Sequence, residues 1–205
     1  REDTPAIQGS TPEERGAWIA RQSDARDTGR DSRVALRMRL FDRRDRVRER
    51  NLILTGLRGG PGRPVPGDRT LIRFTHPADI NGTGLLVWDQ PDGADERFLF
   101  LPALGRTRRI AGGEAQESFV GSDFTYEDIG GREFDDYAYR LLDDRTTWAL
   151  PDAAPQPVYR LESRSRDAAA KYPRVISLIR QDTFVVVHAE IHNRRDEKQK
   201  VFEAQ

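Results

Sequence analysis

The sequence predicts a mainly β protein of the α+β class, in which one N-terminal helix precedes a meander of about ten antiparallel strands. From Ser32 onward, apolar and polar residues alternate with a period of two, which is typical of half-buried strands. Short strand-like segments then recur along the chain, separated by Gly, Pro, Asn and Asp. The sequence contains neither a GxGxxG motif opening a helix nor a GxxxxGK[ST] motif, so a nucleotide-binding parallel sheet is not indicated.

The helix is expected to run from Thr11 to about Arg26. Thr11 is a favourable N-cap, Pro12 suits the first turn, and the two glutamates that follow lie near the positive end of the helix dipole. The apolar side of this helix is thin, so Trp18 is expected to anchor it.

The first two strands are expected to form a hairpin. Residues 32–41 place Leu36 and Met38 in alternation with arginines, residues 42–46 form a polar turn, and residues 47–55 return as the partner strand. A Gly- and Pro-rich loop follows. The same pattern predicts further strands at 69–75, 84–89, 97–101, 136–144, 157–165, 175–180, 183–193 and 198–204.

Length and composition narrow the class of protein. A chain of 205 residues predicts one domain, here residues 11–205, after a disordered lead-in of residues 1–10. Lys+Arg and Asp+Glu are both 34, so no globally basic surface for nucleic acid is indicated. Cysteine is absent, which excludes disulfides and thiolate metal sites within this sequence.

The most informative stretch is FLFLPALGRTRRIAGGEAQESFVGSDFTYEDIGG, from Phe98 to Gly131. It predicts a buried strand ended by Pro102, a short second strand rich in arginine, and an ordered loop that carries acids and aromatics together. The stretch contains no nucleophile–base pair and no metal-ligand spacing. It therefore indicates a shaped surface or a cavity mouth more than a reaction centre.

The same stretch resembles a known family. LPALGRTRRI followed by SFVGSDFTYEDI is similar to the bacterial outer-membrane lipoprotein-sorting protein family, whose members are related in fold to the lipoprotein carrier LolA. THPADINGTGLLVWD (Thr75–Asp89) and SRVALRMRLFDRRDRVRERNLIL (Ser32–Leu54) fit the same family. The resemblance covers roughly Thr11 to Phe202.

The resemblance implies a strongly curved antiparallel half-barrel, capped by helices over an apolar concave face. It also implies a periplasmic, non-enzymatic carrier, exported with its signal peptide removed, that holds a lipid or the acyl chains of a lipoprotein. Such a carrier would work with an inner-membrane RND/MMPL-type exporter and deliver towards the outer membrane. Neither nucleic acid nor a cofactor belongs to this scheme.

Apolar residues of the strands, the helix and the loop are candidates for a cavity lining. The strand residues among them are expected to share faces of neighbouring strands, where they would be ordinary core or a lipid-binding wall. An acyl chain of 14–16 carbons gains on the order of 12 kcal/mol in a dry groove. The candidates are Trp18, Leu36, Met38, Leu86, Trp88, Phe98, Phe100, Phe124 and Tyr126.

Charged residues of two regions are candidates for docking. In the loop, Asp123 either caps a turn while Phe124 and Tyr126 pack inward, or it forms a docking patch or carboxylate pair with its neighbours. The arginines either form the solvent-exposed face of the sheet and prevent pairing at its edge, or they bind anionic lipid headgroups or an acidic partner, as in a peripheral membrane contact. The residues concerned are Asp123, Glu127 and Asp128, Arg43, Arg44, Arg46, Arg48 and Arg50 of the hairpin, and Arg106, Arg108 and Arg109.

No catalytic or metal site is predicted. His188 and His192 lie four residues apart in a β-branched segment, and four residues along a strand span roughly 13 Å, too far for one metal ion. His76 precedes Pro77 in a turn and is interpreted as structural. Ser118 and Ser122 lack a Gly-x-Ser-x-Gly elbow, so a lipid hydrolase is the weaker alternative.

A second alternative is an envelope interaction module without lipid cargo. Members of the family continue with further strands beyond the position of Phe202, whereas this sequence stops at Gln205. Residues 183–193 and 198–204 are therefore expected at an unprotected edge, which favours dimerisation or strand exchange.

Overall fold

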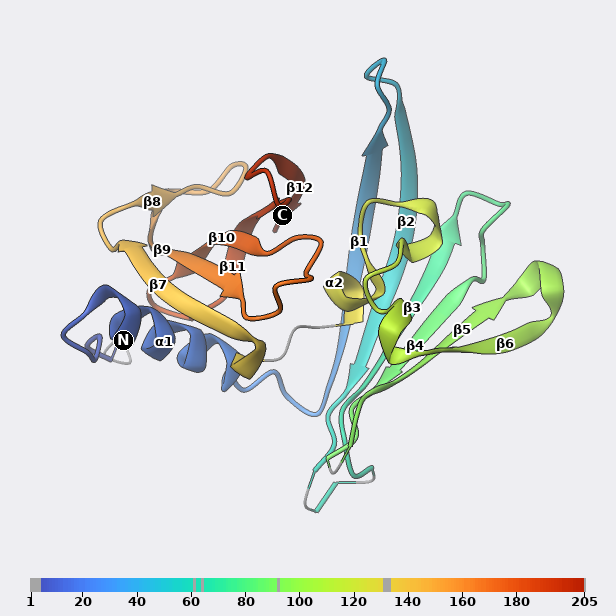
Figure 1. The fold of residues 1–205 in the computed structure, drawn as a ribbon, viewed down its shortest axis with the longest axis horizontal. Helices are drawn as coiled ribbons and strands as arrows, with labels where there is room; N and C mark the ends of the chain where they lie inside the picture. The colour runs from blue at the N-terminus through green and yellow to red at the C-terminus, as the bar shows by residue number, and fades with distance from the viewer. Residues whose placement is uncertain (1–4, 61, 64, 92, 131–133, 205) are drawn as a thin grey trace. The chain divides into compact units, whose positions relative to one another are not determined.

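The computed structural model describes residues 5–60, 62–63, 65–91, 93–130 and 134–204, and the chain folds into two compact units (Figure 1). The central unit is Asp27–Gly130, and the terminal unit joins Arg1–Arg26 to Gly131–Gln205. Each unit has its own antiparallel sheet and its own apolar core. The single domain expected over residues 11–205 stays a prediction.

The central unit is a six-stranded meander in which every strand pairs with its neighbour in sequence. Short helical turns follow its last two strands, and the α2 helix closes the unit. The strands are β1 (Asp31–Phe41), β2 (Val47–Leu57), β3 (Arg69–His76), β4 (Gly84–Trp88), β5 (Glu96–Leu101) and β6 (Arg106–Ile110). The helical elements are η1 (Pro102–Leu104), η2 (Gly112–Glu114), η3 (Phe119–Gly121) and α2 (Tyr126–Gly130).

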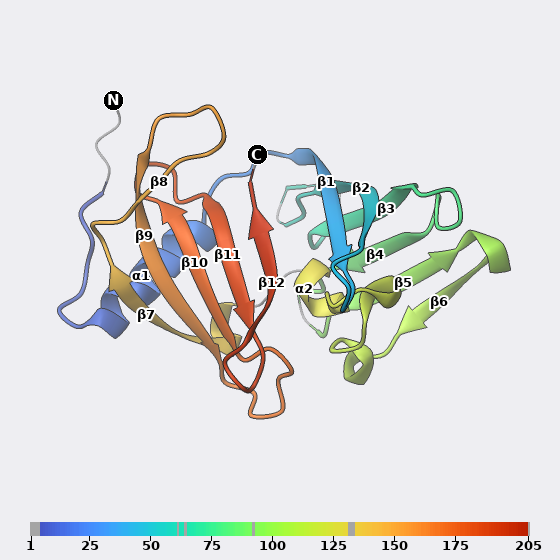
Figure 2. The same ribbon diagram turned by 90° about the horizontal axis from the view of Figure 1, so that it is seen from above.

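The terminal unit packs the α1 helix (Pro12–Asp24) against an open sheet of order β12-β11-β10-β9-β7 (Figure 2). Its core joins Ile19 and Ala20 of α1 to Leu141, Tyr159 and Ile179 of the sheet. The elements are η4 (Phe134–Asp136), β7 (Tyr137–Asp143), β8 (Thr147–Trp148), β9 (Gln156–Ser165), β10 (Arg174–Arg180), β11 (Val186–His192) and β12 (Lys198–Glu203).

The α1 helix begins where the sequence predicts it. The Thr11 side chain accepts a hydrogen bond from the Glu14 backbone N–H, and the Glu14 carboxylate accepts from the Thr11 backbone N–H, which completes a capping box. Ile19 is fully buried, whereas Trp18 is only half-buried, so Ile19 rather than Trp18 is the deeper anchor. Among the described residues, no helix has the length and the apolar character needed to cross a bilayer.

The lead-in expected over residues 1–10 lies partly outside the described residues. In its described part, Ile7 packs against the core of the terminal unit, and Ser10 donates hydrogen bonds to Glu14. At the other end of the chain, β11 pairs with both β10 and β12, so β11 lies inside the sheet and not at the edge where it was expected. Dimerisation or strand exchange through β12 stays a prediction.

The terminal sheet contains an ion network centred on the buried carboxylate of Glu162. Its Oε1 accepts from Arg174 Nε at 2.6 Å and from an Arg164 Nη at 3.0 Å, and Arg174 also pairs with Asp196 at 2.8 Å. Burial alone would raise the pKa of Glu162, but the hydrogen bonds from the two arginines hold this pKa below its usual value. The Glu162 carboxylate is therefore ionised and fully partnered inside the sheet.

We predict that Gly16→Ala destabilises the protein by about 2 kcal/mol. A Cβ at Gly16 would lie 2.7 Å from backbone atoms of Arg140 and Leu141 in β7, and backbone cannot move away cheaply. Urea unfolding measures the change. Gly113→Ala is the matched control, because its Cβ would meet nothing within 4 Å; equal stability of the two variants would contradict the close packing of α1 on β7.

We predict that Glu162→Gln costs about 2 kcal/mol at pH 7, because the partly buried Arg174 and the exposed Arg164 lose the charge of a buried carboxylate. The folded-state pKa of Glu162 is depressed, so its stabilisation is present above the unfolded pKa and is lost as pH falls through the folded pKa. The difference between wild type and variant must therefore shrink on acidification, as urea unfolding at several pH values would show.

The control for this prediction is Glu49→Gln. Glu49 forms an exposed pair with Arg37 at 3.8 Å, so its removal should cost less than about 1 kcal/mol. A difference between wild type and Glu162→Gln that stays constant from neutral to acid pH would contradict the ionised network.

Candidate functional site

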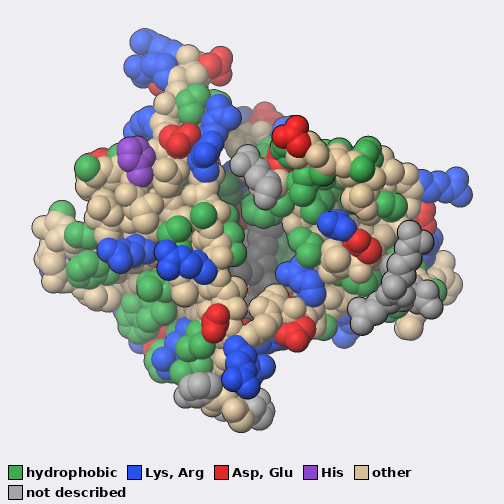
Figure 3. Space-filling model, turned by 180° about the vertical axis from the view of Figure 1, so that it is seen from behind, with side chains coloured by type: hydrophobic (Ala, Val, Ile, Leu, Met, Phe, Trp, Pro, Cys, Tyr) green, Lys and Arg blue, Asp and Glu red, His purple; other side chains and the backbone are tan. Residues whose placement is uncertain are grey.

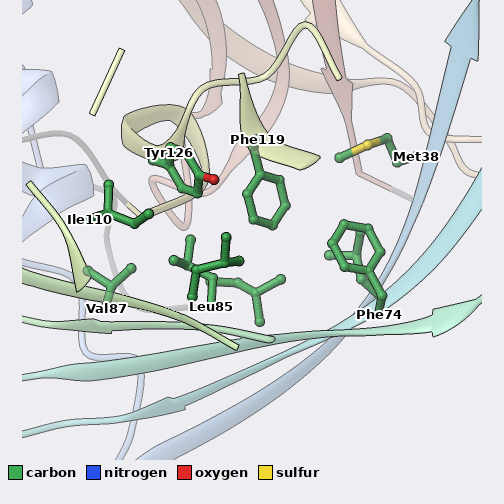
Figure 4. Packing of buried hydrophobic residues seen from close by; sticks show 10 residues of the cluster. Met38, Phe74, Leu85, Val87, Ile110, Phe119 and Tyr126 are labelled. Atoms are coloured by element: carbon green, nitrogen blue, oxygen red, sulfur yellow. The ribbon is translucent and has the colours of Figure 1, made fainter. Parts of the chain in front are cut away.

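One face of the central sheet, called the inner face from here on, has an apolar centre, and arginines of β2, β5 and β6 lie around it. The pairings Leu54↔Ile72, Ile72↔Leu85 and Leu85↔Leu99 carry an unbroken apolar row across four strands. Figure 4 shows Met38, Phe74, Leu85, Val87 and Ile110 pointing to the same side of the sheet. The buried sheet residues of this face are Met38, Leu52, Ile72, Phe74, Leu85, Val87, Leu99 and Ile110, all 7% exposed or less.

The inner face is covered by residues 118–129, called the cover segment. Phe119 is its centre: the ring is fully buried, stacks on Phe74 with centroids 5.4 Å apart, and meets Tyr126 edge-on at 5.7 Å (Figure 4). Val120, Phe124 and Ile129 pack around it. A short, mostly irregular segment therefore closes an apolar surface contributed by all six strands.

The cover segment is held in shape mainly by its own polar groups. The Ser118 hydroxyl donates to the Ser122 carbonyl at 2.6 Å, and the Ser122 hydroxyl donates to the Phe119 carbonyl at 2.8 Å. At the start of α2, the Thr125 N–H donates to the Asp128 carboxylate and the Asp128 N–H donates to the Thr125 hydroxyl. This reciprocal pair is a capping box in which an aspartate takes the place of the usual glutamate.

Arg50 links the sheet to the cover segment. The Arg50 side chain lies on the inner face opposite Met38, and its Nη1 donates to the Val120 carbonyl at 2.5 Å. Its guanidinium also lies 5.9 Å from the Phe74 ring centroid. Burial lowers the pKa of Arg50, with a further contribution from nearby Arg48, and the group remains cationic at any physiological pH.

Val120 accepts this bond from a strained conformation. Its φ of +49° lies in the left-handed region, which disfavours a β-branched residue. Gly121, with φ +66°, completes the turn. The cover segment therefore holds local strain at the point where Arg50 binds it, and such strain is common in elements that move or bind.

A second polar cluster lies beside the cover segment. Arg108 pairs with Glu114 at 2.8 Å and interacts with Tyr126. Burial raises the pKa of the Tyr126 hydroxyl, so this group stays neutral. A backbone hydrogen bond from Ala111, followed by the contact with Arg108, lowers the pKa of Glu114. The cluster orders the segment between β6 and α2.

The structure divides the predicted cavity residues between two faces and two units. Leu36 and Met38 lie on the inner face, and Phe124 and Tyr126 belong to the cover segment. The expectation that the strand residues share a face is wrong. Leu85 and Leu99 form one cross-strand pair on the inner face, and the next pair along the strands, Leu86 and Phe98, therefore points to the opposite face. Residues on the opposite, outer face are Leu86, Trp88, Phe98 and Phe100.

Trp18 lies in the terminal unit. Its ring meets Phe184 edge-on at 5.7 Å, at the border of the core beneath α1. A lipid-contacting role for Trp18 and for the other predicted cavity residues stays a prediction.

The docking candidates do not form one patch. Arg108 and Arg109 are neighbours in β6 and so point to opposite faces, where Arg109 pairs with Glu96 at 2.8 Å. Arg106 and Asp123 are exposed, whereas Asp128 caps α2. Asp128, rather than Asp123, therefore supplies the capping carboxylate of this loop. Docking by these residues stays a prediction.

The histidines and serines have structural surroundings. His188 lies in β11, where its ring centroid is 4.6 Å from that of Trp148, and His192 is buried at the end of the same strand. Among the described residues, no group of three or more His, Asp or Glu side chains is placed to hold a metal ion. The Ser118 and Ser122 hydroxyls donate to main-chain carbonyls, as described above.

A pocket of about 190 Å³ lies in the terminal unit, between the β8–β9 loop and the sheet. It is lined by Trp148, Leu150, Ala153, Ala154, Gln156, Val158, Arg180 and Val187. Its volume is below the roughly 300–1,000 Å³ of typical small-molecule sites. The inner face, which is larger and closed by a strained segment, is the stronger candidate site.

Two residues of this site were missed at the sequence level. Arg50 was grouped with the basic hairpin, although its parity in β2 matches Leu52 and Leu54, and that phase could have placed it on the inner face. Phe119 gave no such signal, because it stands in an irregular segment without periodicity.

Comparison with known proteins supports the fold and the family. Residues 66–205 match a family model described only as an uncharacterized protein. No curated protein matches the chain. A DUF1329 family protein from Desulfovibrio piger is 28% identical, with a TM-score of 0.72 over 94% of this chain and 78% of that one.

Two further solved structures extend the likeness. A putative outer membrane lipoprotein-sorting protein domain from Vibrio parahaemolyticus is 28% identical, with a TM-score of 0.71 over 92% of this chain and 76% of that one. A LolA superfamily protein from Nitrosomonas europaea is 17% identical, with a TM-score of 0.55 over 94% and 76% of the two chains. The mainly β fold class and the lipoprotein-sorting, LolA-like resemblance are confirmed.

We predict that Arg50→Met loosens the cover segment, because the side chain keeps its length but loses the donor to Val120. A hydrogen bond from a charged group is worth about 1.5–3 kcal/mol, so amide hydrogen exchange in residues 118–129 should accelerate by roughly tenfold or more. Arg33→Met is the control, since Arg33 is exposed and lies on the outer face. Equal exchange in wild type and Arg50→Met would contradict the role of Arg50 as a link.

Proposed function

We propose that this chain, which belongs to a family of uncharacterized proteins, is a non-enzymatic periplasmic carrier. It holds a lipid, or the acyl chains of a lipoprotein, on the inner face of the central sheet. Support comes from the likeness to the putative outer membrane lipoprotein-sorting protein domain of Vibrio parahaemolyticus and from the fold shared with the LolA superfamily protein.

The observation that carries this proposal is the cover over the inner face. Strand residues bury their apolar side chains against the short cover segment and Ile80, and Phe119 fills the centre of the cluster. A segment of this kind can leave the sheet without breaking any of the strand pairings, because the ladder β1–β6 is complete without it. The space then released is apolar on the sheet side and suits an acyl chain.

The energetics favour exchange between the cover segment and a lipid. Burial of an acyl chain yields about 0.8 kcal/mol per CH₂ group, which is on the order of 12 kcal/mol for 14–16 carbons. Against this stand the exposure of Phe119 and Tyr126 and the loss of the Arg50 bond to Val120. Closure by the chain's own residues keeps the empty face out of water, and cargo replaces those residues when it binds.

Transfer requires no chemistry on the cargo. A carrier moves lipid from donor to acceptor when donor, carrier and acceptor differ in their affinity for the cargo. In this scheme, the donor is an inner-membrane RND/MMPL-type exporter and the acceptor lies towards the outer membrane. Both assignments come from the family resemblance of the sequence.

The second candidate function is an envelope interaction module without cargo. The dense packing of Phe119 on Phe74 favours it, because a permanently closed inner face would leave only the outer surfaces for function. Retention of lipid by the isolated protein distinguishes the carrier from the interaction module.

We predict that the protein, isolated from an envelope extract without strong detergent, retains lipid that native mass spectrometry detects as added mass. In a fluorescence displacement assay it should also bind a fluorescent fatty acid. Leu36→Glu should weaken fatty-acid binding about tenfold or more, because a charge then lies on the partly buried rim of the inner face.

Ala35→Glu is the matched control, because Ala35 is the exposed neighbour on the other face of the same strand. Circular dichroism verifies that both variants fold. A wild-type protein that neither retains lipid nor binds the fatty acid would refute the carrier and favour the interaction module.

A further inference from the structure

The outer face of the central sheet carries an apolar row that ends in arginine on both sides. Cross-strand pairing places six residues in line, one from each strand of the sheet. In strand order, they are Arg33, Thr55, Leu71, Leu86, Phe98 and Arg109. The next row adds Ile53, Arg73 and Phe100 in the same phase.

Several apolar side chains of this outer face are open to solvent. Leu71 is 44% exposed, Phe100 is 40% exposed and Leu57 is 37% exposed. Leu86, Trp88 and Phe98 are half-buried between them. Figure 3, which views the molecule from the side opposite to Figure 1, shows hydrophobic and basic side chains exposed next to one another on the central unit.

The charge of the outer face departs from that of the whole chain. The chain as a whole carries equal numbers of basic and acidic residues. The strands of the central sheet place six arginines in the outer phase against three acids, Asp31, Glu49 and Glu96. Those arginines are Arg33, Arg37, Arg39, Arg69, Arg73 and Arg109.

The two types of side chain complement each other at a membrane surface. Arginine binds phosphate groups, and the flanking aliphatic and aromatic side chains enter the boundary between headgroups and acyl chains. A second copy of the same face is a poor occupant, because a two-fold contact would bring arginines of one copy against arginines of the other. An anionic bilayer satisfies both the charge and the apolar row.

We propose that the outer face of the central sheet is a docking surface for anionic lipid bilayers. Leu71, Phe98 and Phe100 contact the bilayer interface, while Arg33 and Arg73 contact lipid phosphates. The surface deepens the proposed carrier function by giving the carrier a place on the membrane. It is nevertheless separate from the cargo site, because it uses the opposite face of the same strands.

The test is flotation of the full chain with two kinds of vesicle that have the same acyl chains. One kind is pure phosphatidylcholine, and in the other about one third of the lipid is phosphatidylglycerol. Wild type should bind the anionic vesicles at least about tenfold more tightly, and added salt should weaken the binding. Since both vesicles offer the same acyl chains, removal of lipid as cargo cannot produce this difference.

Two outer-face variants and two matched controls complete the experiment. Leu71→Ser with Phe100→Ser, and separately Arg33→Gln with Arg73→Gln, should each weaken binding about tenfold. The controls are two double variants of the terminal unit, Val201→Ser with Phe202→Ser, and Arg145→Gln with Arg195→Gln. Both should bind as wild type does, since these residues are also exposed but lie outside the outer face. Fatty-acid binding should be unchanged in all four.

Three outcomes would overturn the proposal. Wild type could bind both vesicles equally, or the outer-face variants could bind as well as their controls. Alternatively, sedimentation could show a dimer that Leu71→Ser with Phe100→Ser dissociates, in which case the occupant is a second copy. Loss of fatty-acid binding in Leu36→Glu with intact vesicle binding would show that cargo and membrane sites are independent.

Discussion

The central unit depends on one constraint: an antiparallel sheet with an apolar face must keep that face out of water. Six strands contribute the face, and among the described residues of this unit the segment 118–129, together with Ile80, packs against it. Phe119 therefore enters the centre of the face, and Arg50 fastens the cover at a strained residue, Val120. Most other features of the unit, including the capping box of α2 and the Arg108–Glu114 pair, stabilise this cover.

The terminal unit satisfies the same constraint in a more permanent way. A regular helix, α1, lies on its sheet, and Gly16 lets the helix approach the backbone of β7. The ion network of Glu162 adds polar contacts that are costly to break. One unit thus covers its sheet with a capped helix, and the other with a short strained segment. That contrast is why the central unit is the better candidate for a face that opens.

Strand positions were predictable, but the faces of two strands were not. In β1, apolar and charged residues alternate, so Leu36 and Met38 could be placed on a single face. FLFL in β5 and GLLVW in β4 are apolar at nearly every position, and periodicity cannot then tell which residues point to the core. The cross-strand pairing of Leu85 with Leu99 decided it, and Phe98 and Phe100 went to the outer face.

Most strand positions, the α1 cap at Thr11, the antiparallel class and the family resemblance could be predicted from the sequence, because these depend on local pattern and on motifs, whereas β8, α2 and the division into two sheets could not. The tertiary structure was needed to show that Arg50 binds the cover segment and that Phe119 fills the inner face. These facts depend on strand register and on contacts between residues far apart in the chain. Local propensity carries no information about such contacts, since they form only when the whole sheet is assembled.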